Sequence, residues 1–237
     1  MVFVRTAAMA FNRIADRNID EQNERTRNRE IPSGKISTPS VIVLIIISSL
    51  LFIAITYFIN PICFYLSPVA LAVVLGYSLT KRFTWLCHFI LGLGLSLAPI
   101  GAYLAVTGMF DILPLLFSAT VLTWVGGFDI IYALQDEDFD KSQKLYSIPA
   151  WLGKKKAMRV SEVAHFISAA CIIIAGILAH FGAWYWIGTG IFIFLLYYQH
   201  SLVKPNDLSK VNLAFFTTNG IASIVFSLFV VIELIQT

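Results

Sequence analysis

Two short clusters of acidic residues carry the clearest chemical signal in this 237-residue sequence. The first has the spacing Asn12-x3-Asp16-x3-Asp20, and the second has the spacing Asp136-x3-Asp140. Residues four apart lie on one face of an α-helix, about 6 Å from each other, so each cluster would present two carboxylates side by side. Such hard oxygen ligands suit Mg²⁺, which one or two carboxylates commonly hold together with phosphates and water. The spacing therefore predicts that the two clusters bind Mg²⁺.

Basic residues follow both clusters and would give a bound metal an anionic counterpart. Arginine binds phosphate through two parallel hydrogen bonds, and lysine binds it as a point charge. The basic residues that follow the clusters most closely are Arg25, Arg27, Arg29 and Lys35 after the first and Lys141 and Lys144 after the second. Together with the apolar character described below, they indicate a site for an isoprenoid diphosphate, with its phosphates at the membrane surface and its chain in the bilayer.

Two simpler interpretations of the acidic clusters are weighed against this one. A single aspartate at a helix end is often a solvated cap, and a spacing of four residues also arises by chance. A proton-coupled carrier is the main rival from a different functional class, because acids within membranes often form proton relays. The acids here lie beside long basic loops, however, and the sequence lacks the pair of Gly/Pro-interrupted segments expected of a carrier.

The elements that must position these residues are membrane helices. The chain is 58% hydrophobic and 13% charged, whereas a soluble domain is about 25% charged. This composition excludes a soluble enzyme, a disordered chain and a nucleic-acid-binding domain, and the net charge of +3 is too small to suggest a polyanionic partner. We therefore expect an all-α polytopic bundle in a lipid bilayer, forming a single domain over residues 1–237.

A membrane-spanning helix needs about 20 mostly apolar residues. Seven stretches meet this requirement, and an eighth, from residue 1 to about residue 20, is apolar only as far as Phe11. The seven stretches run near 39–59, 62–80, 85–107, 112–135, 160–181, 183–200 and 212–234. The sequence therefore predicts eight transmembrane segments.

Lysine and arginine residues occur in alternate loops of this arrangement. They follow the first, third, fifth and seventh segments, whereas the turns near 60–61, 107–111 and 180–184 contain none. By the positive-inside rule, the long basic loops face the cytoplasm. We therefore expect an integral protein of a bacterial cytoplasmic (inner) membrane, with its active site on the cytoplasmic side.

The same motifs resemble those of a known family. Asn12-Asp16-Asp20 matches its NxxxDxxxD signature, and Asp136-Asp140 matches its DxxxD signature. The D-x-x-Y that precedes the second signature is matched by Asp129 and Tyr132, and the family's YxxxK is matched by Tyr77 and Lys81. The chain is thus similar to the UbiA superfamily of intramembrane prenyltransferases. The stretches GYSLTKRFTWLCHFILGLGLSLAPIGA and SIPAWLG resemble its 4-hydroxybenzoate polyprenyltransferase branch.

The resemblance implies a reaction in ubiquinone or menaquinone biosynthesis: Mg²⁺-dependent transfer of a polyprenyl group from polyprenyl diphosphate to an aromatic acid, with 4-hydroxybenzoate favoured. It implies that Asp16, Asp20, Asp136 and Asp140 bind the metal with the help of Asn12, and that Arg25, Arg29, Tyr77 and Lys81 contact the diphosphate. Asp16, Asp136 and Asp129 are the expected catalytic residues, Asp129 as acceptor of the ring proton or as a residue that orients its neighbours. Arg13 and Arg17 would either bind the ring carboxylate or pair with the acids.

Other aromatic acceptors remain open alternatives. A dihydroxynaphthoate of a menaquinone pathway is the second choice of acceptor, and a haem or chlorophyll precursor is less favoured. The four histidines (His88, His165, His180 and His200) show no metal-ligand spacing and are interpreted as packing or interfacial residues.

The sequence also departs from the family at its N-terminus. The family has nine helices, and a helix from Met1 to Asp16 would rise only about 24 Å, which is less than the bilayer's hydrocarbon thickness of about 30 Å. We therefore expect a chain truncated at the N-terminus, without the family's first helix.

Overall fold

The computed structural model describes residues 1–236, and these residues fold as helices and connecting loops without a β-strand. The all-α prediction is therefore confirmed for this part of the chain. The helices are α1 (Val2–Ala15), α2 (Arg17–Gln22), α3 (Thr38–Ile59), α4 (Pro61–Thr80), α5 (Cys87–Thr107), α6 (Ile112–Ala133), the 3₁₀ turn η1 (Leu134–Asp136), α7 (Glu137–Ser142), α8 (Ile148–Leu152), α9 (Lys154–Leu178), α10 (Ala183–Leu202), the π-helix η2 (Leu213–Thr218) and α11 (Asn219–Gln236).

Local sequence signals explain several helix ends. Ser37 caps α3, because its hydroxyl accepts a hydrogen bond from the backbone N–H of Ser40. Asn60 ends α3 and caps α4 by accepting from the N–H of Cys63 at 2.9 Å, with Pro61 in the first helical position, where its missing N–H costs nothing. Gly108 ends α5 with a φ of 68°, a conformation that side chains other than glycine rarely adopt.

Six helices of the described residues are long and apolar enough to cross a membrane, so the prediction of eight spanning segments is wrong for this structure. The six are 38–59, 61–80, 87–107, 112–142, 154–178 and 213–236. The N-terminal segment fails because α1 has 14 residues and rises only about 21 Å. The segment 183–200 does form a helix of full length, α10, but its aromatic and polar residues, including Gln199 and His200, lower its hydropathy.

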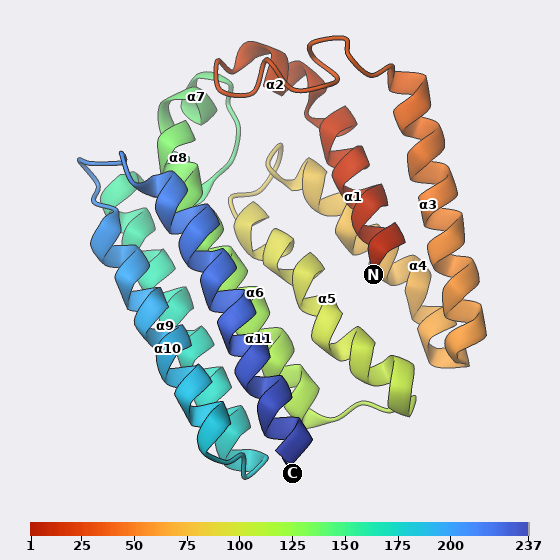
Figure 1. Cartoon of the computed structure of the whole chain (residues 1–237). Coiled ribbons are helices and arrows are strands. Elements are labelled where there is room, and N and C mark those ends of the chain that lie inside the picture. Colours follow the sequence, from red (N-terminus) through yellow and green to blue (C-terminus); the bar gives the residue numbers. More distant parts are fainter. Residues whose placement is uncertain (237) are drawn as a thin grey trace.

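The helices form two groups joined by α5 (Figure 1). One group contains α1, α3 and α4, and the other contains α6, α9, α10 and α11, while α5 packs against both α4 and α6. The contact between α5 and α6 is close at Gly92, where an added Cβ would collide with the carbonyl oxygen of Leu122. The first acidic motif begins on α1 and the second follows α6, so the two motifs belong to different groups.

The connections that carry the basic residues lie at one end of the bundle (Figure 1). They include the loop after α2, the short helices α7 and α8, and the α10–η2 connection, while the α3–α4, α5–α6 and α9–α10 turns lie at the other end. The loops that carry lysine and arginine thus gather at one end of the bundle, and both acidic motifs lie at that same end.

Candidate active site

Each acidic motif lies where a long helix gives way to a short one. Asp16 separates α1 from the six-residue helix α2, which contains Asp20. Asp136 ends the 3₁₀ turn η1 between α6 and the six-residue helix α7, which contains Asp140. The two motifs therefore share a local design, in which the first aspartate sits at an irregular turn and the second lies inside the short helix.

The irregular turns bring the first aspartate of each motif to one cavity of about 400 Å³. Seven of the ten residues predicted from the sequence line this cavity, namely Asn12, Asp16, Arg29, Tyr77, Lys81, Asp129 and Asp136. The other three, Asp20, Arg25 and Asp140, do not line it, but each forms an ion pair with a residue that does. The structure thus gathers residues from α1, α4 and α6 and from the loop after α2 around one space.

In the N-terminal motif, Asp16 and Asp20 each have a basic partner. Asp16 pairs with Arg82 at 3.2 Å and accepts a hydrogen bond from the side-chain amide of Asn12 at 3.1 Å. Burial raises the pKa of Asp16, and the positive charge of Arg82 opposes this increase. Asp20 is buried, and both its oxygens accept hydrogen bonds from one nitrogen of Arg29, at 2.7 and 2.9 Å.

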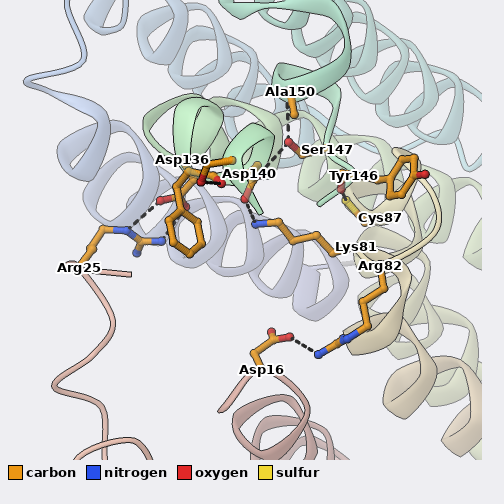
Figure 2. Close-up of polar contacts among 12 residues, drawn as sticks. Asp16, Arg25, Lys81, Arg82, Cys87, Asp136, Asp140, Tyr146, Ser147 and Ala150 are labelled. Atoms are coloured by element: carbon orange, nitrogen blue, oxygen red, sulfur yellow. Dashed lines mark hydrogen bonds and ion pairs between the residues drawn. The ribbon is translucent and has the colours of Figure 1, made fainter. Parts of the chain in front are cut away.

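In the C-terminal motif, the partners come from distant parts of the chain (Figure 2). Arg25 pairs with Asp136 at 2.7 Å and donates a further hydrogen bond to the Tyr132 hydroxyl at 2.8 Å. Asp140 is completely buried, pairs with Lys81 at 2.7 Å and accepts a hydrogen bond from the Ser147 hydroxyl at 2.8 Å. The second motif is therefore held by segments before and after it in the sequence.

Lys81 is positively charged in this arrangement. Burial alone would lower the pKa of its ammonium group, but the adjacent Asp140 carboxylate outweighs this effect and raises the pKa above its ordinary value. The backbone of Lys81 is also held in place, because the N–H of Tyr146 donates a hydrogen bond to the carbonyl oxygen of Lys81 at 2.8 Å. Lys81 thus presents a fixed positive charge at the cavity wall.

The donor set is compatible with a divalent cation held partly by substrate. Among residues 1–236, no group of three or more His, Cys, Asp or Glu side chains gathers closely enough to hold a metal by itself. One carboxylate from each motif, Asp16 and Asp136, does reach the common cavity, together with the Asn12 amide. Because Mg²⁺ is commonly held by one or two carboxylates with phosphates and water, these residues fit such an ion.

An aromatic wall of Tyr132, Phe215 and Phe216 completes the cavity. Tyr132 and Phe215 are stacked with ring centroids 4.1 Å apart, and Phe216 meets Tyr132 edge-on. Both phenylalanines lie in the π-helix η2, a distortion often found at functional sites. The cavity therefore has charged groups and an aromatic surface in contact with the same space.

Sequence reasoning missed three residues of this site. Arg82 pairs with Asp16, Ser147 bonds to Asp140, and His88 bonds to Asp129 at 2.6 Å. The interpretation of His88 as a packing residue was incomplete, because its imidazole also lines the cavity. The sequence held one signal for a partner such as His88: Asp129 is an acid within an apolar helix, and such an acid requires a partner.

Arg13 and Arg17, which the sequence offered as partners of the acids, form no ion pair among the described residues. Arg82 pairs with Asp16 instead.

Comparison with known proteins agrees with this geometry. The sequence profile described as the UbiA prenyltransferase family matches residues 1–221. The chain is 30% identical over 219 residues to a 4-hydroxybenzoate octaprenyltransferase of Shewanella piezotolerans, covering 92% of this chain and 76% of that protein. It is 28% identical over 236 residues to the enzyme of the same name from Francisella tularensis subsp. tularensis, covering 100% of this chain and 81% of that protein.

Solved structures give the same result for the fold. The apo structure of a UbiA homolog from Aeropyrum pernix K1 superposes with a TM-score of 0.90 at 31% identity, covering 98% of this chain and 86% of that one. A digeranylgeranylglyceryl phosphate synthase superposes with a TM-score of 0.75 at 22% identity, covering 99% and 83%. The second match concerns the fold alone.

Proposed function

Because the chain belongs to the UbiA prenyltransferase family, we propose that it is an integral membrane enzyme that transfers a polyprenyl group from polyprenyl diphosphate to an aromatic acid. We propose 4-hydroxybenzoate as the acceptor and ubiquinone biosynthesis as the pathway, since the relatives described above carry that activity in their names. One observation carries the proposal: Asp16 and Asp136, 120 residues apart (136 − 16), line one cavity with Arg29 and Lys81. These matches, all to prenyl-transfer enzymes or their homologues, give no support to a proton-coupled carrier.

Asp16 and Asp136 would hold a divalent cation, for which we propose Mg²⁺, with Asn12 assisting and with Asp20 and Asp140 behind them. When bound, the cation supplies positive charge that stabilises the diphosphate as it leaves. Asp20 and Asp140 contribute by holding Arg29 and Lys81 in place, because each acid pairs with one of these bases.

Arg29 and Lys81 would bind the diphosphate, with Arg25 and Tyr77 assisting. Guanidinium and ammonium groups aimed at a leaving group stabilise the charge that develops there. Arg25 now pairs with Asp136 through two nitrogens. If Asp136 holds the cation, Arg25 would no longer be needed as its partner and could bind phosphate.

The aromatic wall is the part of the cavity where we place C1 of the polyprenyl group, the carbon that reacts. Breaking the bond between C1 and oxygen sends its electron pair to the diphosphate and leaves an allylic cation, which the ring attacks through a carbon atom. Tyr132, Phe215 and Phe216 line the cavity with aromatic surface, which would exclude the water that otherwise captures the allylic cation. Asp129 would accept the proton that the ring then loses.

The test is transfer of a labelled polyprenyl group in membranes containing the protein, with 4-hydroxybenzoate, a dihydroxynaphthoate and other aromatic acids as acceptors. We expect product with 4-hydroxybenzoate, release of pyrophosphate and loss of both on removal of divalent cations. Asp16→Ala and Asp136→Ala should each lower turnover by about 10²-fold or more, as does loss of one group that stabilises a transition state. Asp138→Ala is the matched control, because Asp138 is exposed two residues from Asp136.

Unchanged turnover in Asp16→Ala or Asp136→Ala would remove these residues from the site. Preference for a dihydroxynaphthoate would move the enzyme to a menaquinone pathway. We also propose that the cavity faces the cytoplasm of a bacterial inner membrane, because the loops at its end carry the lysines and arginines. Labelling of a cysteine placed at Asp138 from the outside of intact cells would contradict that orientation.

A further inference from the structure

We propose that His88 is a positioning residue that holds Asp129 in the orientation needed to accept the ring proton. His88 lies in the first turn of α5, and Asp129 lies on α6. This inference rests on the proposed function, because it assigns a role within the same cavity. It concerns a side chain that the sequence pattern left without a chemical role.

Two hydrogen bonds determine which nitrogen of His88 carries the hydrogen. The backbone N–H of Ile148 donates to Nε2 of His88 at 3.3 Å, so Nε2 is an acceptor. Nδ1 therefore carries the hydrogen and donates it to Oδ2 of Asp129 at 2.6 Å. With both nitrogens engaged, the imidazole is held in one orientation and acts as a donor toward Asp129.

The remaining carboxylate oxygen of Asp129 is the one available for chemistry. Among residues 1–236, no group donates a hydrogen bond to Oδ1 of Asp129. The side chain of Asp129 is 23% exposed and lines the cavity, whereas that of His88 is only 4% exposed. The pair thus consists of a buried imidazole behind a carboxylate that is open to the cavity.

This geometry suits the last step of ring alkylation. Formation of the carbon–carbon bond leaves a cationic ring whose alkylated carbon still carries its hydrogen. Transfer of that proton to Oδ1 of Asp129 returns the C–H electron pair to the ring and restores aromaticity. His88 takes no proton in this step, because Ile148 occupies Nε2; it holds the carboxylate through Oδ2.

The same contact joins the proton acceptor to the diphosphate side of the cavity. Ile148 directly follows Ser147, whose hydroxyl bonds to Asp140, the partner of Lys81 (Figure 2). The residue before them, Tyr146, binds the backbone of Lys81. The turn 146–148 therefore fixes His88 and Lys81 relative to each other. As a result, Asp129, which accepts the proton, and Lys81, which binds the leaving group, keep a constant relative position.

The test compares His88→Leu, which removes both hydrogen bonds, with His88→Gln, whose amide can donate to Asp129 and accept from Ile148. We expect kcat to fall about 10²-fold in His88→Leu with KM nearly unchanged, because the loss falls on proton transfer. His88→Gln should recover most of the loss. If His88 instead carried the proton, His88→Gln would be as impaired as His88→Leu.

An isotope effect distinguishes positioning from mere packing. With 4-hydroxybenzoate deuterated at the reacting ring carbon, His88→Leu should show a larger primary isotope effect on kcat than the wild type, because proton removal becomes slower. His88→Leu should add little to the loss in Asp129→Asn, since both act through one group. His165→Leu is the control for removal of a buried imidazole, because His165 bonds to His200 and the Trp124 carbonyl outside the cavity.

Three results would overturn the inference: wild-type kcat in His88→Leu, losses that multiply in the double variant, or an isotope effect that stays at the wild-type value. If His88→Leu does not accumulate in membranes, His88→Met takes its place, because a thioether cannot donate a hydrogen bond to Asp129, and the same three results would overturn the inference. Absence of product in the wild-type protein would instead contradict the proposed function. The two failures are therefore distinguishable.

Discussion

The two acidic motifs share a spacing and a local design, but they are stabilised differently. Most partners of the N-terminal motif are local, since Asn12 is four residues from Asp16 and Arg29 is nine residues from Asp20. The C-terminal motif depends on distant partners: Arg25, 111 residues away in sequence, binds Asp136, and Lys81 binds Asp140. Similar spacing therefore does not mean similar dependence on the tertiary structure.

The difference separates two kinds of contribution. Asp16 and Asp136 both line the cavity and should matter about equally for turnover. Asp20 and Asp140 lie behind them, and Asp140 has both the more complete burial and the larger set of partners. We therefore expect loss of stability, more than loss of activity, to distinguish the two motifs.

The largest effect is expected for Asp140→Asn. The substitution leaves the charge of Lys81 without its partner, and breaking a buried pair costs about 3 kcal/mol. Unfolding of the detergent-solubilised protein measures this change. Removing the lysine charge as well, in Asp140→Asn with Lys81→Met, should recover part of the loss; a double variant as unstable as the sum of the single ones would contradict the assignment.

A smaller loss of stability, about 2 kcal/mol, is expected for Ser147→Ala. Ser147 caps α8 by accepting from the N–H of Ala150, and its hydroxyl also donates to the buried Asp140. Ser37→Ala is the matched control, because Ser37 caps α3 at an exposed site that involves no carboxylate. Equal losses for the two variants would show that the bond to Asp140 contributes nothing.

Asp20→Asn should cost only about 1 kcal/mol. The two bases do not distinguish the pairs, because Arg29 and Lys81 are each 31% exposed. The acids do: the Asp20 side chain is 6% exposed, whereas Asp140 is completely buried and also accepts a hydrogen bond from Ser147, so more is lost at Asp140. The same unfolding assay, run beside Asp140→Asn, checks the order of the two values. A cost for Asp20→Asn above that for Asp140→Asn would reverse the comparison between the motifs.

The smallest effect within the ordinary pH range concerns Lys81 and Asp140. Because the folded-state pKa of Lys81 is raised, the stabilisation from this pair is fully present below the ordinary lysine value of 10.5 and is lost as pH rises through the raised pKa. The stability difference between the wild type and Lys81→Met should therefore be constant from pH 7 to pH 9 and shrink above about pH 10.5. A difference that shrinks between pH 7 and pH 9 would contradict the charged state of Lys81.

Patterns along the chain predicted much of the fold and the members of the site. The apolar runs predicted helices, and their boundaries agree with α3 to α6 to within a few residues. The number of spanning segments could not be obtained in this way, because α1 is short and α10 mixes aromatic with polar residues. The site's partners were harder still: nothing in the spacing of Arg82 or His88 indicates that one contacts Asp16 and the other Asp129.

The order of amino acids is enough to predict apolar helices with charge near their ends, because placing polar groups in lipid is costly. It also determined which acids recur at helical spacing. Which acid reaches the cavity and which is buried behind it became clear from the folded chain, since that depends on the turns at Asp16 and Asp136. The tertiary structure also decided the ion pairs, because a buried carboxylate takes whichever base the packing of distant helices brings within reach.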